Sequence, residues 1–409
     1  MRVIIAGNGV AGITVARLLR EKDSESNIRI CAREKVHYYP RPRLTEVMGI
    51  EQLVPNQLTF YKPEWYEERR IEVSLGISLE GIDRECRTVA LSDGSQAKYD
   101  ALVLAMGARS NLPPIDGAGK PGVFALRTID DLLSIRQYAR GAGRGVVIGG
   151  GLLGLEAAKG LRTLGLDVSV VEFFPRLLPR QLDVEGADLF RALVQAMGIE
   201  VYLNAVTSAI AGEDRVEGVT LKDGTRIPCD LVLISAGITP NKELAQAAGL
   251  LTGKGVAVDS AMRTSDSNIY AVGDCVEHDG RVYGIIPAAV EQARVAADSI
   301  LGASTLYKGT ILSNSLKAVG IDLTSIGVVT PEAEGFEELR VRDDARGVYR
   351  KVSVKEGKVL GAIIIGETRS VPHLAQIIAK GVDVSAVKAS LLQEGFDFKG
   401  FLRGAGSGA

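Results

Sequence analysis

The positions of apolar residues along the chain show one pattern twice. In each copy an apolar run predicts a buried strand, the next stretch has the spacing of an amphipathic helix, and a further apolar run predicts another strand. Each copy is therefore a β-α-β unit. The predicted strand, helix and strand cover residues 3–6, 13–20 and 28–32 in the first copy, and residues 146–148, 155–164 and 168–172 in the second.

A second repeated element lies downstream of each unit. Residues 99–107 match residues 229–237, and both read as an apolar strand that ends in glycine. Each follows an Asp-Gly pair, at Asp93 or Asp223, of the kind that joins antiparallel strands in a hairpin. The order of β-α-β unit, antiparallel strands and closing strand thus occurs twice, which predicts an α/β protein with two dinucleotide-binding domains.

The pattern changes after the second unit. Residues 268–274 predict one more strand, and its last residue, Asp274, could accept hydrogen bonds from polyol hydroxyls or cap the following segment. From about Tyr307 the chain predicts a third, smaller α+β domain. The expected elements of this second half are a long helix at 287–301, strands at 348–354 and 359–365, and helices at 374–380 and 384–392.

The composition is that of a large folded protein. The chain has 409 residues, of which 46% are hydrophobic and 24% charged, enough to bury several cores. Its net charge of −2 provides no general attraction to nucleic acid or to an anionic membrane surface. The N-terminus leads directly into a predicted strand, and the longest nearly apolar run, 145–157, is too short for a bilayer. We therefore expect a cytoplasmic protein without a signal peptide or membrane span.

The four cysteines are widely spaced, at positions 31, 86, 229 and 275. Zinc sites, iron–sulfur sites and redox dithiols need clustered thiolates. No metal site is therefore expected, and the predicted state is four separate thiols in a reducing compartment.

Both β-α turns contain the sequence G-x-G-x-x-G. Its first glycine allows a tight turn, its second lets a pyrophosphate approach the backbone, and its third lets the helix pack closely, with the phosphate at the helix N-terminus. One isolated copy is a weak signal, but two copies between a strand and a helix favour nucleotide binding over a ligand-free turn. The candidate residues are Gly7, Asn8, Gly9, Val10, Ala11 and Gly12 in the first turn, and Gly149, Gly151, Leu152, Leu153 and Gly154 in the second.

An acidic residue at the end of the second strand can bind the ribose hydroxyls of adenosine. Glu172 has this position in the second unit and favours NADH over NADPH, although Arg176 lies close enough to bind a 2′-phosphate. In the first unit the acid is Glu34, one position later than usual. Arg33 could instead face the adenosine or its phosphates, and Arg33 and Glu34 could also be ordinary surface charges.

The whole set of motifs resembles the FAD- and NAD-dependent pyridine nucleotide oxidoreductases with the glutathione-reductase-like fold, over about residues 1–305. The resemblance implies an FAD-binding domain at 1–112 and 245–305, an inserted NAD-binding domain at 113–244, and a C-terminal α+β domain at 306–409. It also implies that Asp274 holds the ribityl chain and that the helix beginning near Pro287 directs its N-terminus at the flavin. The cofactor-binding residues expected on this basis are Ala105, Met106, Gly107, Gly237, Gly273, Asp274 and Pro287.

Three segments, at 38–44, 179–183 and 316–322, are similar to the NADH:rubredoxin oxidoreductases and to the flavoprotein part of large-subunit nitrite reductases. This resemblance implies that Arg41 and Arg127 contact FAD. It also implies two candidate catalytic residues, Glu156 where nicotinamide meets the flavin and Lys317 near the isoalloxazine. The alternatives are a surface arginine at 127, a dipole-favoured acid at 156 and a solvated lysine at 317.

The chain departs from the wider family at residues 41–48. Disulfide reductases carry a redox cysteine pair in this region, whereas this chain has no cysteine there. Because disulfide exchange needs a thiolate, that reaction is excluded. Glu46 also stands where many ferredoxin-reductase relatives place a lysine near the flavin.

The expected activity is hydride transfer from NADH to FAD, followed by electron transfer to an iron–sulfur carrier such as rubredoxin or ferredoxin. One alternative is an NAD-linked FAD subunit of a multi-subunit iron–sulfur or tungsten oxidoreductase of the aldehyde or 2-oxoacid type, with an iron–sulfur partner subunit. Two others are an NADH oxidase and a redox-sensing binding protein. The acceptor and the oligomeric state do not follow from the sequence.

Overall fold

The computed structural model describes residues 1–50, 55–311, 313–331 and 334–406. Contacts divide the chain into two compact units, each made of several segments. The first comprises Met1–Asn111, Arg127–Ile129 and Gly237–Thr310, and the second comprises Leu112–Leu126, Asp130–Ala236 and Ile311–Ala409. The boundaries of three domains expected from the sequence stay a prediction.

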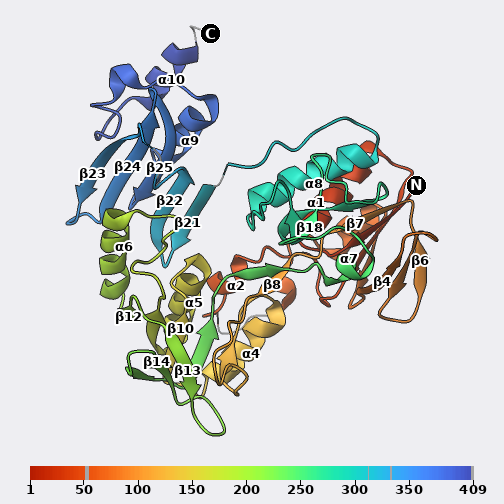
Figure 1. Cartoon of the computed structure of the whole chain (residues 1–409), viewed down its shortest axis with the longest axis horizontal. Helices are drawn as coiled ribbons and strands as arrows, with labels where there is room; N and C mark the ends of the chain where they lie inside the picture. The colour runs from red at the N-terminus through yellow and green to blue at the C-terminus, as the bar shows by residue number, and fades with distance from the viewer. Residues whose placement is uncertain (51–54, 312, 332–333, 407–409) are drawn as a thin grey trace. The chain divides into compact units, whose positions relative to one another are not determined.

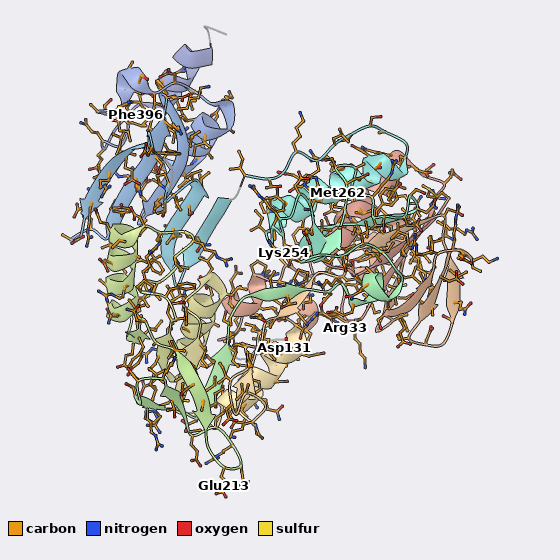
Figure 2. The ribbon with its side chains drawn as sticks, in the orientation of Figure 1. Arg33, Asp131, Glu213, Lys254, Met262 and Phe396 are labelled. Carbon is orange, nitrogen blue, oxygen red and sulfur yellow. The ribbon has the colours of Figure 1, made fainter. Side chains whose placement is uncertain are left out.

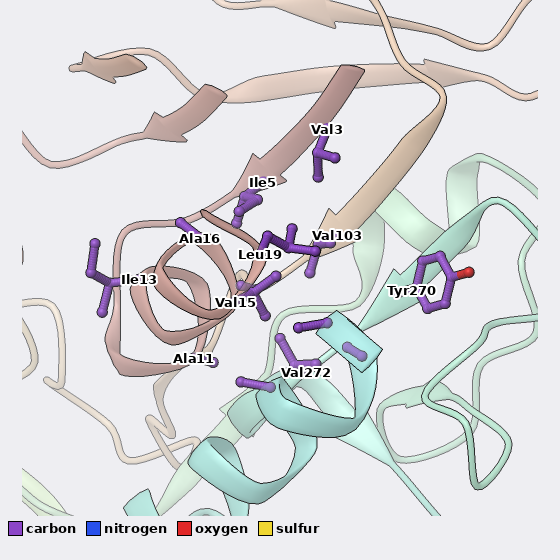
Figure 3. Close-up of a cluster of buried hydrophobic side chains, with 14 of the residues drawn as sticks. Val3, Ile5, Ala11, Ile13, Val15, Ala16, Leu19, Val103, Tyr270 and Val272 are labelled. Atoms are coloured by element: carbon purple, nitrogen blue, oxygen red, sulfur yellow. The ribbon is translucent and has the colours of Figure 1, made fainter. Parts of the chain in front are cut away.

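The first unit is built on a five-stranded parallel sheet with the order β19-β7-β1-β2-β3. Helices α1 and α8 pack together on one of its faces (Figure 1). Their apolar residues and those of the strands form one buried cluster, which includes Ile5, Val15, Leu19 and Val103 (Figure 3). The bounds are β1 Arg2–Ala6, α1 Val10–Lys22, β2 Asn27–Ala32, β3 Ile71–Leu75, β7 Ala101–Leu104, β19 Ile269–Ala271 and α8 Ile286–Ile300.

A second buried cluster lies on the other face of this sheet, and an antiparallel three-stranded sheet, β4-β5-β6, contributes to it. The Asp93-Gly94 turn joins β5 to β6, as the sequence predicts. The remaining elements of the unit are α2 Arg43–Glu46, η1 Pro55–Gln57, α3 Pro63–Glu68, β4 Leu79–Asp83, β5 Thr88–Leu91, β6 Gln96–Lys98, β8 Ala108–Ser110, β17 Ile238–Pro240, α7 Glu243–Ala247, β18 Val256–Ala257, η2 Gly273–Cys275 and β20 Val276–Glu277.

The second unit repeats this plan and adds a further domain. Its parallel sheet has the order β12-β11-β10-β16-β9, and the antiparallel sheet β13-β14-β15 accompanies it. The bounds are β9 Val123–Phe124, α4 Ile129–Ala139, β10 Arg144–Ile148, α5 Leu152–Thr163, β11 Asp167–Val171, α6 Val184–Ala196, β12 Ile199–Tyr202, β13 Thr207–Ala211, β14 Gly218–Leu221, β15 Arg226–Pro228 and β16 Leu231–Ile234.

The C-terminal part of the second unit is an antiparallel sheet with the order β21-β22-β25-β24-β23. Apolar residues of β24, β25 and α9 form its core. The bounds are β21 Ser313–Ala318, β22 Ile321–Gly327, β23 Glu337–Asp343, β24 Val348–Lys355, β25 Lys358–Ile365, α9 Val371–Lys380, η3 Ser385–Val387 and α10 Phe398–Gly406. Within the described ranges, no helix combines the length and apolarity needed to cross a bilayer.

The α/β class with two Rossmann-like domains and a C-terminal α+β domain is confirmed. One predicted helix is wrong. Residues 384–392 contain only the short η3 helix, because Val384, Leu391 and Leu392 are buried in the C-terminal core from irregular backbone rather than from one helix face.

Candidate cofactor-binding sites

The first glycine turn joins β1 to α1. Gly7 has a φ of 116°, and a Cβ added to it would lie 2.3 Å from the Ala105 carbonyl oxygen at the end of β7. A Cβ on Gly12 would lie 2.0 Å from the Gly7 oxygen. Only glycine fits at these two positions, because they bring the turn, the helix and the neighbouring strand into direct backbone contact.

The second turn, between β10 and α5, reproduces this geometry. Gly149 has a φ of 114°, and its added Cβ would lie 2.3 Å from the Ser235 oxygen. The corresponding distance from Gly154 to the Gly149 oxygen is 2.0 Å. The sequence repeat is therefore also a repeat in the backbone geometry of the turn.

The middle glycine of each turn differs from the other two. A Cβ on Gly9 or Gly151 would meet nothing within 4 Å, so each turn is open on this side. Both residues stand at the helix N-terminus, where no side chain caps the free N–H groups. The Asn8 Oδ1 atom is buried and has no hydrogen-bond partner. Open space beside uncapped N–H groups fits a bound pyrophosphate, so these two turns can hold FAD and NAD; the Asn8 oxygen can only accept a hydrogen bond and is not part of that fit.

Glu172 follows β11 and is 5% exposed. Its carboxylate accepts hydrogen bonds from the Gly150 N–H at 2.6 Å and from the Phe174 N–H at 2.8 Å. The acid thus fixes the glycine turn as well as the loop after the strand. Arg176 donates to the carbonyl oxygens of Pro179 and Leu182, each at 3.3 Å, which directs its guanidinium toward its own loop.

Glu34 follows β2 and belongs to a network of charged side chains. It accepts hydrogen bonds from Arg41 at 2.8 Å and from the Tyr39 hydroxyl. Tyr39 is 6% exposed, and its hydroxyl also accepts from the Ile129 N–H at 3.2 Å. Burial raises the pKa of Tyr39, so the hydroxyl stays a donor to Glu34. Arg33, by contrast, lies exposed at the surface (Figure 2).

Arg127 and Asp274 complete this network. Arg127 donates to Asp274 Oδ2 at 2.7 Å and to the Ala108 oxygen at 3.0 Å, and its own carbonyl oxygen accepts from Arg41. Four residues predicted separately to contact FAD, namely Glu34, Arg41, Arg127 and Asp274, are thus joined by direct hydrogen bonds. Their roles toward FAD stay predictions.

Other predicted FAD residues lie at the ends of neighbouring elements in the first unit. Gly273 is pressed between α1 and α8, since its added Cβ would lie 2.9 Å from the Ala11 side chain and 3.9 Å from that of Ala289. Pro287 stands in the first turn of α8, whose N-terminus has no side-chain cap. The strand ends carry positive φ angles, 63° at Gly107 and 90° at Gly237. Asn241 fixes the backbone at the end of β7, because its side-chain Nδ2 donates to the Met106 oxygen and its backbone N–H donates to the Gly107 oxygen.

The two predicted catalytic residues lie in the second unit. Glu156 is on α5, two residues after the last glycine of the motif, and its carboxylate accepts from the Val319 N–H at 2.9 Å. Lys317 lies on β21 opposite Asp322, and its side chain is outside the described part of the structure.

No described cysteine has the features of a redox centre. Burial raises the pKa of Cys229 to about 12 and that of Cys275 to about 11, and it also raises the pKa of Cys31. Cys86 is exposed, but its hydrogen bond with Asp83 raises its pKa as well. Among the described residues, no three His, Cys, Asp or Glu side chains converge as a metal site would require.

The sequence reasoning did not identify several aromatic residues around these turns. Phe173 and Phe174, 61% and 49% exposed, directly follow Glu172 and contact each other edge to face. Tyr66 is buried and accepts from Asn8 Nδ2 at 3.4 Å, beside the first turn. Phe173 and Phe174 could have been predicted from the sequence, because aromatic residues directly after the acid of a glycine-turn unit are well placed to contact an adenine.

Comparisons with known proteins agree with this geometry. Residues 1–297 match the family described as pyridine nucleotide-disulphide oxidoreductase, and residues 313–382 match the rubredoxin NAD+ reductase C-terminal domain. The solved ferredoxin reductase for the CYP199A2 system of Rhodopseudomonas palustris superposes with a TM-score of 0.88. It is 32% identical and covers 98% of this chain and 99% of its own.

Three curated relatives have comparable identity. Nitrite reductase [NAD(P)H] of Bacillus subtilis is 37% identical over 399 residues, which is 96% of this chain and 49% of the relative. NADH oxidase of Methanocaldococcus jannaschii is 34% identical, covering 90% of this chain and 88% of the relative, and rubredoxin-NAD(+) reductase of Pseudomonas putida is 35% identical, covering 75% and 81%. This chain spans about half the length of the first of these relatives. It belongs to the pyridine nucleotide-disulphide oxidoreductases, enzymes that use FAD and NAD(P)H.

Proposed function

We propose that this chain oxidises NADH and passes the electrons to a small iron–sulfur protein of the rubredoxin or ferredoxin class, in the cytoplasm. The observation that carries the proposal is the pair of glycine turns, which share their backbone geometry and are each open beside an uncapped helix N-terminus. Two such sites suit a bound flavin nucleotide and a nicotinamide nucleotide. The match of residues 313–382 to a rubredoxin NAD+ reductase domain supports the type of acceptor.

The first turn and the charged network would hold FAD. The N–H groups at the start of α1 would bind its pyrophosphate, Asp274 its ribityl hydroxyls and Glu34 its adenosine ribose. Bound there, FAD supplies hydride acceptance from NADH and release of single electrons. The chain's own contribution is to orient the reactants and to exclude competing reactions, for which no cysteine and no acid–base group is needed.

The second turn would hold the nicotinamide nucleotide. The α5 N-terminus would bind its pyrophosphate, and Glu172 its adenosine ribose. The carboxylate would repel a 2′-phosphate, and Arg176 is bonded within its own loop, so both features favour NADH over NADPH.

A second candidate function is that of a flavoprotein portion of a larger assembly. It is favoured by the curated nitrite reductase of Bacillus subtilis, which is about twice as long as this chain. In that case the C-terminal domain would contact an iron–sulfur partner subunit or a further domain. Direct reduction of O₂ is a third possibility, since the NADH oxidase of Methanocaldococcus jannaschii matches most of the chain.

One anaerobic experiment distinguishes these functions. The FAD-loaded protein is reduced with NADH, and rubredoxin, ferredoxin, nitrite or O₂ is then added separately while flavin absorbance is followed. Fast reoxidation by rubredoxin or ferredoxin supports the proposal. Fast reoxidation by O₂ alone indicates an oxidase, and slow reoxidation by every acceptor indicates that an additional subunit is needed.

A further inference from the structure

Two sequence segments that distinguish this chain, 179–183 and 316–322, have no assigned role beyond the predicted Lys317. In the structure both lie where the C-terminal sheet contacts the nucleotide-binding part of the same compact unit. Two hydrogen bonds make these contacts, from Val319 to Glu156 and from Tyr349 to Asp183, and their partners are 163 and 166 residues apart in the sequence.

The first contact is between the β21–β22 hairpin and helix α5. Val319 and Gly320 form the hairpin turn, because Ala318 pairs with Ile321. The Val319 N–H donates to Glu156 at 2.9 Å, and the Val319 side chain is 2% exposed. Lys159 lies on the same face of α5, with its Nζ 3.3 Å from the position of a Cβ on Gly320. The tip of the hairpin is therefore seated on the helix that begins at the second glycine turn.

The hairpin turn is strained. Val319 has a φ of 51° and Gly320 a φ of 87°, which is the geometry of a type I′ turn. Glycine accepts this conformation, whereas a β-branched residue with positive φ is an outlier. Such strain persists only where the surroundings enforce it, and it concentrates at functional positions. Here the bond to Glu156 and the burial of Val319 enforce it.

The second contact is a buried charged cluster centred on Asp183. This residue caps α6 and accepts hydrogen bonds from the Tyr349 hydroxyl at 2.7 Å and from Lys351 at 3.0 Å. Lys351 is 2% exposed and also pairs with Glu338 at 2.6 Å. Because both partners of Asp183 lie on β24, this cluster holds the C-terminal sheet against α6.

We propose that Glu156 is a positioning residue, which fixes the hairpin carrying Lys317 by accepting from the Val319 N–H. The Asp183 cluster acts on β24, whereas the Glu156 bond acts at the tip of the β21–β22 hairpin. The expected effect on electron transfer rests on the proposed function, together with the prediction that Lys317 is a catalytic residue. The contact itself is independent of which acceptor the enzyme uses.

Hydrogen exchange measured by mass spectrometry on the FAD-loaded full chain tests this assignment. In Glu156→Ala we expect the amides of the 313–327 hairpin to exchange about tenfold faster, because the bond to a charged acceptor is lost. Glu156→Gln retains a carbonyl oxygen that can accept the same bond, and should restore slow exchange. Thr163→Ala, an exposed substitution on the same helix, is the matched control and should exchange like the wild type.

A second measurement separates positioning from nucleotide binding. At saturating NADH, Glu156→Ala should slow reoxidation by rubredoxin, with recovery in Glu156→Gln. Hairpin exchange in Glu156→Ala equal to that of the wild type would overturn the proposal, and a rise in the KM for NADH alone would then assign Glu156 to the nucleotide. If no carrier reoxidises the flavin in any variant, the proposed function fails, while the exchange result still decides the role of Glu156.

Discussion

The close approach of Gly154 to Gly149 leads to a quantitative prediction for Gly154→Ala. The added Cβ would lie 2.0 Å from the Gly149 oxygen, whereas ordinary contact begins at 3.4 Å. The start of α5 must therefore move away from the turn by 1.4 Å, the difference between these two distances. No flexible side chain can relieve the contact, because the atom it meets belongs to the backbone.

Two effects of this displacement can be measured. Overpacking of this kind costs about 1–3 kcal/mol. For a unit of this size each kcal/mol lowers Tm by about 2–4 °C, so we expect a fall of about 2–12 °C in the transition of the second unit. A displacement of roughly 1 Å at a binding turn can cost about 100-fold in rate, so kcat/KM for NADH should fall by about that factor. The FAD content should stay that of the wild type, because the first turn is unchanged.

Gly151→Ala is the matched control. Its added Cβ meets nothing within 4 Å, and its φ of −77° is one that alanine adopts readily. This variant should melt close to the wild type yet bind NADH more weakly, since the methyl group enters the space assigned to the pyrophosphate. Thermal melting and equilibrium titration with NADH provide both readouts. A Gly154→Ala variant with the Tm and NADH affinity of the wild type would show that the close backbone contact is not required. Tight NADH binding by Gly151→Ala would show that the pyrophosphate does not bind at this turn.

Three further predictions follow from single side chains. Glu172→Gln leaves one of two N–H donors without its acceptor, so the KM for NADH should rise about tenfold and the ratio of activity with NADH to activity with NADPH should fall. The exposed Glu200→Gln is the control and should match the wild type in steady-state kinetics. Burial alone would raise the pKa of Asp183, but hydrogen bonds from Tyr349, Gly186 and Lys351 outweigh it and hold this pKa below its ordinary value of 3.8. The ionised Asp183 carboxylate therefore stabilises the folded state fully above that pH, and this contribution is lost as the pH falls below it. The Tm difference between wild type and Asp183→Asn should then shrink in acid. A Tm difference that stays constant down to pH 2 would contradict a lowered pKa for Asp183. Iodoacetamide at neutral pH should alkylate Cys86 slowly and the three buried cysteines hardly at all, and mass spectrometry together with NADH-driven flavin reduction should show modified protein with unchanged activity.

Local patterns were sufficient to predict the geometry of the two glycine turns. The strand, the glycines and the helix are adjacent in sequence, so the geometry of Gly7 and Gly149 follows from a few consecutive residues. The predicted ends of the helices were less accurate than the predicted turns. Helix α1 begins at Val10 rather than Ile13, because the third glycine of the motif lies inside the helix, where close packing outweighs its low helix propensity.

Contacts between distant segments could not be predicted in the same way. Glu156 and Val319 lie 163 residues apart, and nothing local to either one indicates the other. The same holds for Lys351, whose burial against Asp183 has no signature in the alternating pattern of β24. A lysine in a strand normally indicates the solvent face, and only the fold supplies the two carboxylates that make its burial possible.

The two turns have equal backbone geometry, but their acidic residues are supported differently. Glu172 bonds to Gly150 and Phe174, so the second site is fixed largely by one short segment. Glu34 bonds instead to Tyr39 and Arg41, and through Arg41 to a network that ends at Asp274. The first site therefore needs residues from three distant parts of the chain before it is complete. Under the proposed function, the FAD site is thus assembled from distant segments of the chain, whereas the site of the nicotinamide nucleotide is fixed by one local segment.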